Sequence, residues 1–188
     1  MEVELKAEAR DRRLARMVAI TVVALSVFTG FGNIKDGNIV QAMQQAKADS
    51  VDRWGEYQAT RTKAHIAETA RTEISVLIAL PASASAATAA LRPLNAQIAR
   101  YHQEIPRLRA QAAAFGDRYD ALNVHDDQFD ASEALISTAI SMAAVSALVE
   151  SSALLIAAWA FGAFGIVMGL CGFAGLAFHP DILSNLLG

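Results

Sequence analysis

The stretch from Ala160 to Gly175, AFGAFGIVMGLCGFAG, contains five glycines and no charged residue. It lies inside an uncharged run, Ala153 to Phe178, which as a helix would exceed the ~30 Å hydrocarbon core of a bilayer. Glycine weakens a helix by roughly 1 kcal/mol relative to alanine, so its abundance here needs another reason. In lipid, small residues let helix backbones approach closely, and the stretch therefore predicts a membrane-spanning helix packed tightly on a neighbour.

The small residues of this run fall on one helical face because they advance alternately by four and three positions. The face consists of Ala158, Gly162, Gly165, Gly169 and Gly172. The preceding apolar segment has a similar series of small residues that includes Ser137 and Ser141. We predict that both faces are helix-packing interfaces, either against each other within a hairpin or against another subunit.

Three segments are predicted to cross the membrane: residues 17–34, 133–149 and 153–178, with a tight turn at Glu150. Residues 1–16 carry five basic residues, which places this segment in the cytoplasm by the positive-inside rule. A cleaved signal peptide is the rival interpretation, but the leader also contains acidic residues and no A-x-A site follows, so a retained anchor is favoured. Residues 179–188 are predicted to be an interfacial tail.

The middle of the chain, residues 35–132, predicts a long antiparallel helical hairpin that stands outside the cytoplasm. One helix is expected over residues 36–80, and the apex of the hairpin is expected near residues 81–93. The return segment has an apolar stripe with coiled-coil spacing, and Pro106 within it is expected to kink the helix without breaking it. The stripe comprises Leu94, Ile98, Tyr101, Ile105, Leu108, Ala112, Phe115, Tyr119 and Leu122. The expected fold is therefore all-α, an integral membrane protein with three transmembrane helices and this hairpin between the first and second.

Two stretches resemble an uncharacterised bacterial membrane-protein family, domain of unknown function 4337. They are DRWGEYQATRTKAHI, residues 52–66, and HDDQFDASEALISTAI, residues 125–140. The layout of an N-terminal anchor, a charged helical hairpin and two closely spaced spans is also similar to that family. The resemblance implies a bacterial membrane protein. Together with the orientation from the basic residues, it leads us to expect a place in the bacterial cytoplasmic (inner) membrane, with the hairpin in the periplasm. The family has no established activity, so the resemblance identifies no functional residues in this chain.

One aromatic group on the hairpin is a candidate for partner recognition. Trp54, Tyr57 and Arg61 share a helical face by their spacing, and an arginine over an aromatic ring can contribute ~0.5–1 kcal/mol. Packing between the two helices of the hairpin is the alternative role for these side chains.

An acidic stretch precedes the second span and contains His125, Asp126, Asp127, Asp130 and Glu133. Carboxylates spaced by three and four share a helix face and could hold a divalent cation. The simpler interpretation is that Asp127 or Asp130 caps the N-terminus of the second span. We therefore assign no metal ligands.

The remaining sequence excludes several functional classes. The chain has 188 residues and a net charge of −3 with dispersed basic residues, which predicts no nucleic-acid partner. It lacks a P-loop, a G-x-S-x-G motif and metal-binding His or Cys pairs, so we expect no enzyme activity, no catalytic residue, no cofactor and no small-molecule substrate.

The function that the sequence favours is that of a non-enzymatic membrane protein. Its expected partners are membrane lipid and either copies of itself or other membrane subunits, on which it would dock as an accessory subunit. A small channel or transporter component is the alternative, and a metal-responsive membrane sensor is a weaker one.

Overall fold

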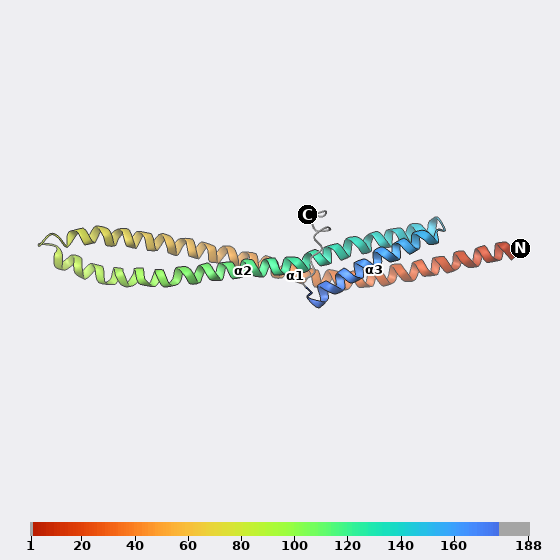
Figure 1. Ribbon diagram of the computed structural model, residues 1–188, viewed down its shortest axis with the longest axis horizontal. Coiled ribbons are helices and arrows are strands. Elements are labelled where there is room, and N and C mark those ends of the chain that lie inside the picture. Colours follow the sequence, from red (N-terminus) through yellow and green to blue (C-terminus); the bar gives the residue numbers. More distant parts are fainter. Residues whose placement is uncertain (1, 177–188) are drawn as a thin grey trace. The chain divides into compact units, whose positions relative to one another are not determined.

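The computed structural model describes residues 2–176, with side chains from Ala9 onward, and these residues form three helices (Figure 1). Helix α1 spans Glu2–Leu77, α2 spans Ala84–Leu148 and α3 spans Ser152–Ala174. Each helix contains a segment long and apolar enough to cross a membrane. The predicted tail, residues 179–188, lies outside the described residues.

The first two helices are longer and more continuous than the sequence predicts. Helix α1 contains both the expected span 17–34 and most of the expected helix 36–80 without a break. The non-helical connection covers only residues 78–83, whereas the apex was expected near residues 81–93. The segment from Ala84 is helical because alanine has the highest helix propensity, and α2 continues through Pro93 and Pro106.

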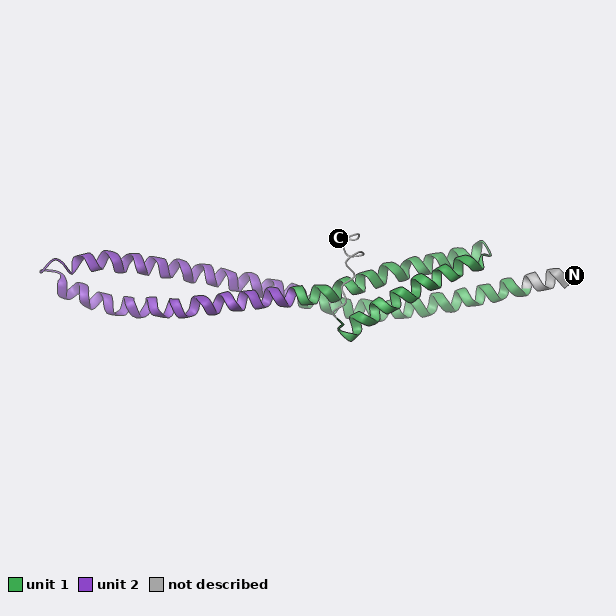
Figure 2. Ribbon diagram, in the orientation of Figure 1, with its two compact units in different colours: residues 1–43, 120–188 green, residues 44–119 purple. Residues whose placement is uncertain are grey.

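The chain divides into two compact units (Figure 2). Unit 2, residues 44–119, is a closely packed antiparallel pair formed by the second part of α1 and the first part of α2. Its interface is lined mainly by small side chains. The buried residues are Ala46, Thr60, Ala64, Ala67, Ala87, Ile98, Leu108 and Ala112.

The apolar stripe of the return segment is the face of α2 that packs in unit 2. Its members from Leu94 to Tyr119 are all buried or half-buried, and the residues between them are largely exposed. Two polar contacts also join the helices, from the Ser50 hydroxyl to the Ala112 carbonyl oxygen at 3.2 Å and between His102 and Glu68 at 2.7 Å.

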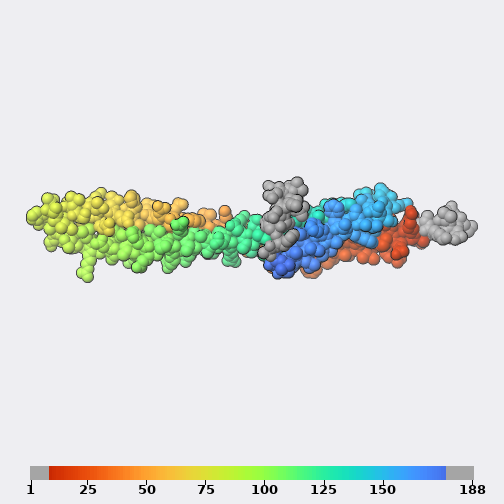
Figure 3. Space-filling model, viewed as in Figure 1, coloured from red at the N-terminus to blue at the C-terminus, as the bar shows by residue number. Residues whose placement is uncertain are grey.

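Unit 1, residues 1–43 and 120–188, combines the start of α1, the end of α2 and all of α3. Figure 3 shows the side chains of α3, in blue, directly against those of α2. Two buried clusters join the three helices; one contains Leu14, Val18, Ala143, Leu155 and Ala158, and the other contains Leu25, Ile136 and Ala139.

The turn between α2 and α3 is short and has defined caps. Glu150 adopts the left-handed conformation, with φ of 52°, which reverses the chain. The Ser151 side chain accepts a hydrogen bond from the Leu154 backbone amide and so caps α3. At the other end, Gly175 takes a φ of 65° and closes the helix in a conformation that glycine adopts without a Cβ penalty.

Candidate functional site

The glycine face of α3 is buried in unit 1. Ala158, Gly162, Gly165, Gly169 and Gly172 are all buried. A Cβ added at Gly165 would lie 2.7 Å from Ile136 Cγ1 and 3.1 Å from the Ser132 carbonyl oxygen. The neighbouring helix therefore packs directly on the α3 backbone at this point, which only glycine permits.

The glycine face meets two helices, and sequence reasoning missed one of them. A Cβ at Gly169 would lie 2.7 Å from Phe28 Cε1, and a Cβ at Gly162 would lie 3.2 Å from Leu25 Cδ1, both on α1. The signal was present in the sequence, because one series of residues on α1 also advances by four and three, and all its members are buried or half-buried. The series is Leu14, Val18, Thr21, Leu25, Phe28 and Gly32.

The face of α2 that packs on α3 is not the small-residue face with Ser137 and Ser141 that the sequence suggests. Ser137 and Ser141 are exposed, and the Ser141 hydroxyl donates to the Ser137 carbonyl oxygen of its own helix at 2.9 Å. The face that points inward is instead a second series of residues on α2. It includes larger apolar side chains, which fill the space beside the glycines. It comprises Ser132, Ile136, Ala139, Ala143 and Ser146. A contact of Ser137 and Ser141 with another subunit stays a prediction.

Hydrogen bonds connect the three helices of unit 1. The Ser132 hydroxyl donates to the Gly165 carbonyl oxygen at 2.8 Å, and the Trp159 indole donates to the Thr21 hydroxyl at 2.9 Å. At the end of α3, the side-chain amide of Gln128, a fully buried residue, donates to the Leu176 carbonyl oxygen at 2.8 Å. These bonds satisfy groups that would be costly to leave unpaired in an apolar environment.

Beyond these contacts, α1 and α2 bring acidic side chains together. Asp36 on α1 and Asp126 on α2 lie close enough for each carboxyl to shift the pKa of the other. Burial, together with the negative charges of Asp130 and Asp36, raises the pKa of Asp126 to about 6. Burial and then the charge of Asp130 raise the pKa of Asp36, while the neighbouring Asp126 carboxyl opposes this rise.

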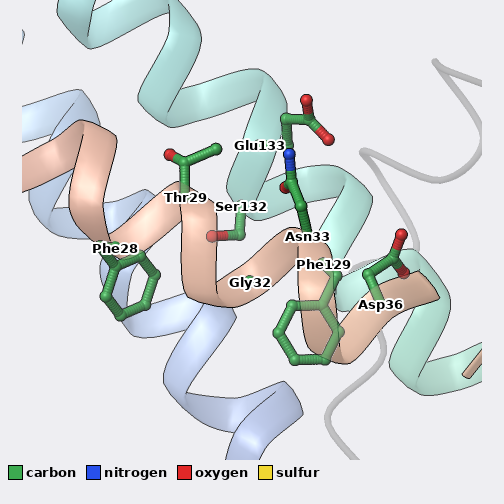
Figure 4. Close-up of a pocket in the computed structure, with 8 residues that line it drawn as sticks. All are labelled: Phe28, Thr29, Gly32, Asn33, Asp36, Phe129, Ser132 and Glu133. Carbon is green, nitrogen blue, oxygen red and sulfur yellow. The ribbon is translucent and has the colours of Figure 1, made fainter. Parts of the chain in front are cut away.

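A small pocket adjoins Asp36 and is lined by residues of both α1 and α2 (Figure 4). Its volume is about 10 Å³, which is close to the space that one water molecule needs. Aromatic rings line one side, and carboxylate, amide and hydroxyl groups line the other. The lining residues are Phe28, Thr29, Gly32, Asn33, Asp36, Phe129, Ser132 and Glu133.

The structure corrects the expected role of the acidic stretch as a helix cap. Because α2 runs without interruption from Ala84 to Leu148, Asp127 and Asp130 lie in the middle of a helix and cap no N-terminus. Among the described side chains, residues 9–176, no group of three or more His, Cys, Asp or Glu residues is arranged to hold a metal ion. Asp36 was missed in the sequence because its partner lies on another helix, which no spacing rule within one segment can indicate.

The aromatic group of the hairpin lies on α1 in unit 2. Trp54 and Tyr57 make an edge-to-face contact with ring centroids 5.3 Å apart, and the Arg61 guanidinium lies 5.6 Å from the centre of the Tyr57 ring. Tyr57 is half-buried, while Trp54 and Arg61 are exposed. The structure thus brings the three side chains together, and their recognition of a partner stays a prediction.

These features define the class: residues 2–176 are all-helical and form three helices long and apolar enough to cross a membrane, one of them packed through a glycine face. The chain belongs to the family described as domain of unknown function DUF4337, whose model matches residues 14–175. No curated protein and no solved structure matches the chain.

Proposed function

We propose that the protein is a non-enzymatic structural or interaction protein of the bacterial cytoplasmic membrane. In this proposal unit 1 is the anchor in the lipid, residues 1–16 lie in the cytoplasm, and unit 2 is a coiled-coil-like hairpin on the periplasmic side. The protein acts as a homo-oligomer or as an accessory subunit of a larger membrane complex.

The observation that carries this proposal is the apolar outer surface of unit 1. Many large apolar side chains point outward in addition to those buried inside, such as Leu25, Ile136 and Leu155, and such a surface suits solvation by lipid. The exposed side chains include Ile20, Val23, Val27, Phe31, Ile34, Ile156, Phe161, Phe164, Val167 and Leu170.

Unit 2 supports a role in interaction. Its two helices meet through small side chains, so the pair buries little apolar area of its own. Large apolar side chains remain exposed on it, including Val51, Ile66 and Val76. Further copies or another protein would cover this surface and stabilise the hairpin.

The exposed small residues of α2 offer a contact between subunits within the membrane. Ser137 and Ser141 lie one helical turn apart on a face that unit 1 leaves uncovered, which is the spacing of small-xxx-small contacts. Replacing both with leucine is expected to reduce cross-linked oligomer. Val23→Leu, at an exposed position of α1, is the matched control and should leave cross-linking unchanged.

The experiment begins with carbonate-washed membranes treated with a bifunctional cross-linker, followed by native mass spectrometry in mild detergent. The proposal expects the protein in the washed pellet, in an assembly heavier than one chain. A monomer without cross-links would overturn the interaction role, and solute flux through proteoliposomes of the pure protein would favour the channel alternative.

A further inference from the structure

The connection between α1 and α2 lies within an uncharged stretch of unit 2. No Asp, Glu, Lys, Arg or His occurs from Ile74 to Leu91, and the charged residues Glu73 and Arg92 flank this stretch directly. The connection closes one end of the helical pair that Figure 2 shows in purple. We call residues 74–91 the tip. A turn has little protein around it to cover apolar groups, so a turn in contact with water normally carries polar side chains.

The tip exposes large apolar side chains in close succession. Leu77 is 45% exposed, Ile78 is 40% exposed and Leu80 is 55% exposed, and Ala79 between them is exposed as well. Another helix, including one from a second copy, is recognised through a stripe of residues at three- and four-residue spacing. These residues instead follow one another around a turn. A fluid apolar surface can accept such an end without a matching stripe or groove.

The backbone of the connection holds most of its amide groups in internal hydrogen bonds. The amides of residues 78–80 each donate to the carbonyl oxygen three residues earlier, at 3.2 or 3.3 Å. The amides of Ser83 and Ala84 both donate to the Leu80 carbonyl oxygen at 3.0 Å. Pro81 has no amide hydrogen that needs a partner. The turn therefore depends little on water for its amide donors.

The Ser83 side chain serves the carbonyl groups in the same way. Its hydroxyl donates to the Leu77 carbonyl oxygen at 2.9 Å, at the end of α1, where helical carbonyl groups lack amide partners. Water can satisfy such groups at a solvated turn, whereas lipid offers them no partner. A turn that is both apolar outside and bonded inside therefore suits a lipid surface better than water.

We propose that the tip of unit 2 is a lipid-binding element that inserts the side chains of its turn into the surface of a phospholipid bilayer. Leu77, Ile78 and Leu80 enter the boundary between headgroups and acyl chains. The flanking charges of Glu73 and Arg92 oppose each other, so apolar insertion rather than attraction to anionic lipid supplies the binding. The inference goes beyond the interaction role proposed above, because it requires no second protein.

Quenching of a fluorophore by brominated lipid measures the insertion in the full-length protein. The label is attached at Ala79→Cys, with Cys171, the free cysteine, replaced by alanine. The protein is reconstituted in phosphatidylcholine and mixed with phosphatidylcholine vesicles, and the acyl chains of both membranes carry bromine. Loss of fluorescence relative to unbrominated lipid is expected. The same label at Ala99→Cys, an exposed alanine of α2 outside the tip, should keep its fluorescence.

Polar substitutions identify the side chains that insert. Leu77→Asn, Ile78→Asn and Leu80→Asn together should abolish the quenching at position 79. Val51→Asn with Ile66→Asn is the matched control, because it changes exposed apolar residues of unit 2 outside the tip and should leave the quenching intact. Equal helix content by circular dichroism shows that each variant is folded.

The comparison of labels at positions 79 and 99 needs no polar variant, so it decides the proposal even if the triple variant fails to fold. Unquenched fluorescence at position 79, or equal quenching at both positions, would overturn it. Cross-linking of the tip to a second copy without quenching would also overturn it, because a protein contact would then cover the turn. Quenching that a folded triple variant retains would overturn the role of the three apolar side chains.

Discussion

Substitution of Gly165 by alanine tests how closely α3 approaches α2. The new Cβ would lie 2.7 Å from Ile136 Cγ1 and 3.1 Å from the Ser132 carbonyl oxygen, and Ile136 is fully buried. Overpacking of this kind costs about 1–3 kcal/mol, while the gain in helix propensity returns up to ~1 kcal/mol. Separation of the helices would also weaken the Ser132 hydrogen bond to Gly165, a contribution of about 0.6 kcal/mol.

The expected net loss for Gly165→Ala is therefore about 1–2 kcal/mol of unfolding free energy. Gly30→Ala is the matched control, because this glycine lies in α1 of the same unit and nothing lies within 4 Å of its added Cβ. The control should be neutral or up to ~1 kcal/mol more stable than wild type, so the two variants should differ by about 2 kcal/mol.

Reversible unfolding in mixed micelles containing sodium dodecyl sulfate measures this difference. Trp159 reports on the contact, since its indole bonds to Thr21 on another helix. The measurement uses a Trp54→Phe background, in which Trp159 is the remaining tryptophan. Equal stability of Gly165→Ala and Gly30→Ala would refute the close packing of α3 on α2.

Three further predictions concern other contacts of unit 1. Thr21→Val removes the acceptor of the Trp159 hydrogen bond and should lower the unfolding free energy by about 0.6–1 kcal/mol in the same titration; an unchanged value would show that the bond contributes nothing. Glu150→Gly relieves the left-handed conformation of the turn and should raise stability by about 0.5–1 kcal/mol, seen as a higher Tm; a lower Tm would contradict this. Because the raised pKa of Asp126 means that the folded state binds more protons, stability should fall as the pH rises from about 4 to about 6 and then level off. The loss is on the order of 1 kcal/mol after allowance for solvent screening, and a pH profile of unfolding that is flat, or that rises, would oppose it.

Much of the helical organisation could be predicted because it depends on local patterns. The uncharged run at 17–34 and most of the run predicted at 153–178 coincide with helices that are long and apolar enough to cross a membrane. The four-three stripe from Leu94 onward coincides with the packed face of α2. The small residues of α3 indicated a buried face for the same reason, since glycines at this spacing share one side of a helix.

Features that depend on contacts between distant segments could not be predicted in the same way. Two series of residues with four-three spacing fit α2 almost equally, and the structure turns inward the one that places Ile136 beside Gly165. The pairing of Asp36 with Asp126 depends on the register of α1 against α2, which neither segment specifies alone. The local sequence favours a helix N-terminus near Asp130, but α2 continues through this residue without a break. Packing along both units outweighs the local preference for a cap.

The most direct test of the central claim is disulfide formation in carbonate-washed membranes. Ala139 Cβ lies 3.5 Å from the position of a Cβ at Gly162, which is within the range that a disulfide needs. With Cys171 replaced by alanine and a protease site inserted at Glu150, A139C/G162C should keep the two cleaved fragments together until a reductant is added. The exposed S137C paired with G162C should release them at once. A bond in S137C/G162C and none in A139C/G162C, or recovery of the protein outside the membrane pellet, would contradict a lipid-embedded bundle packed on the glycine face of α3.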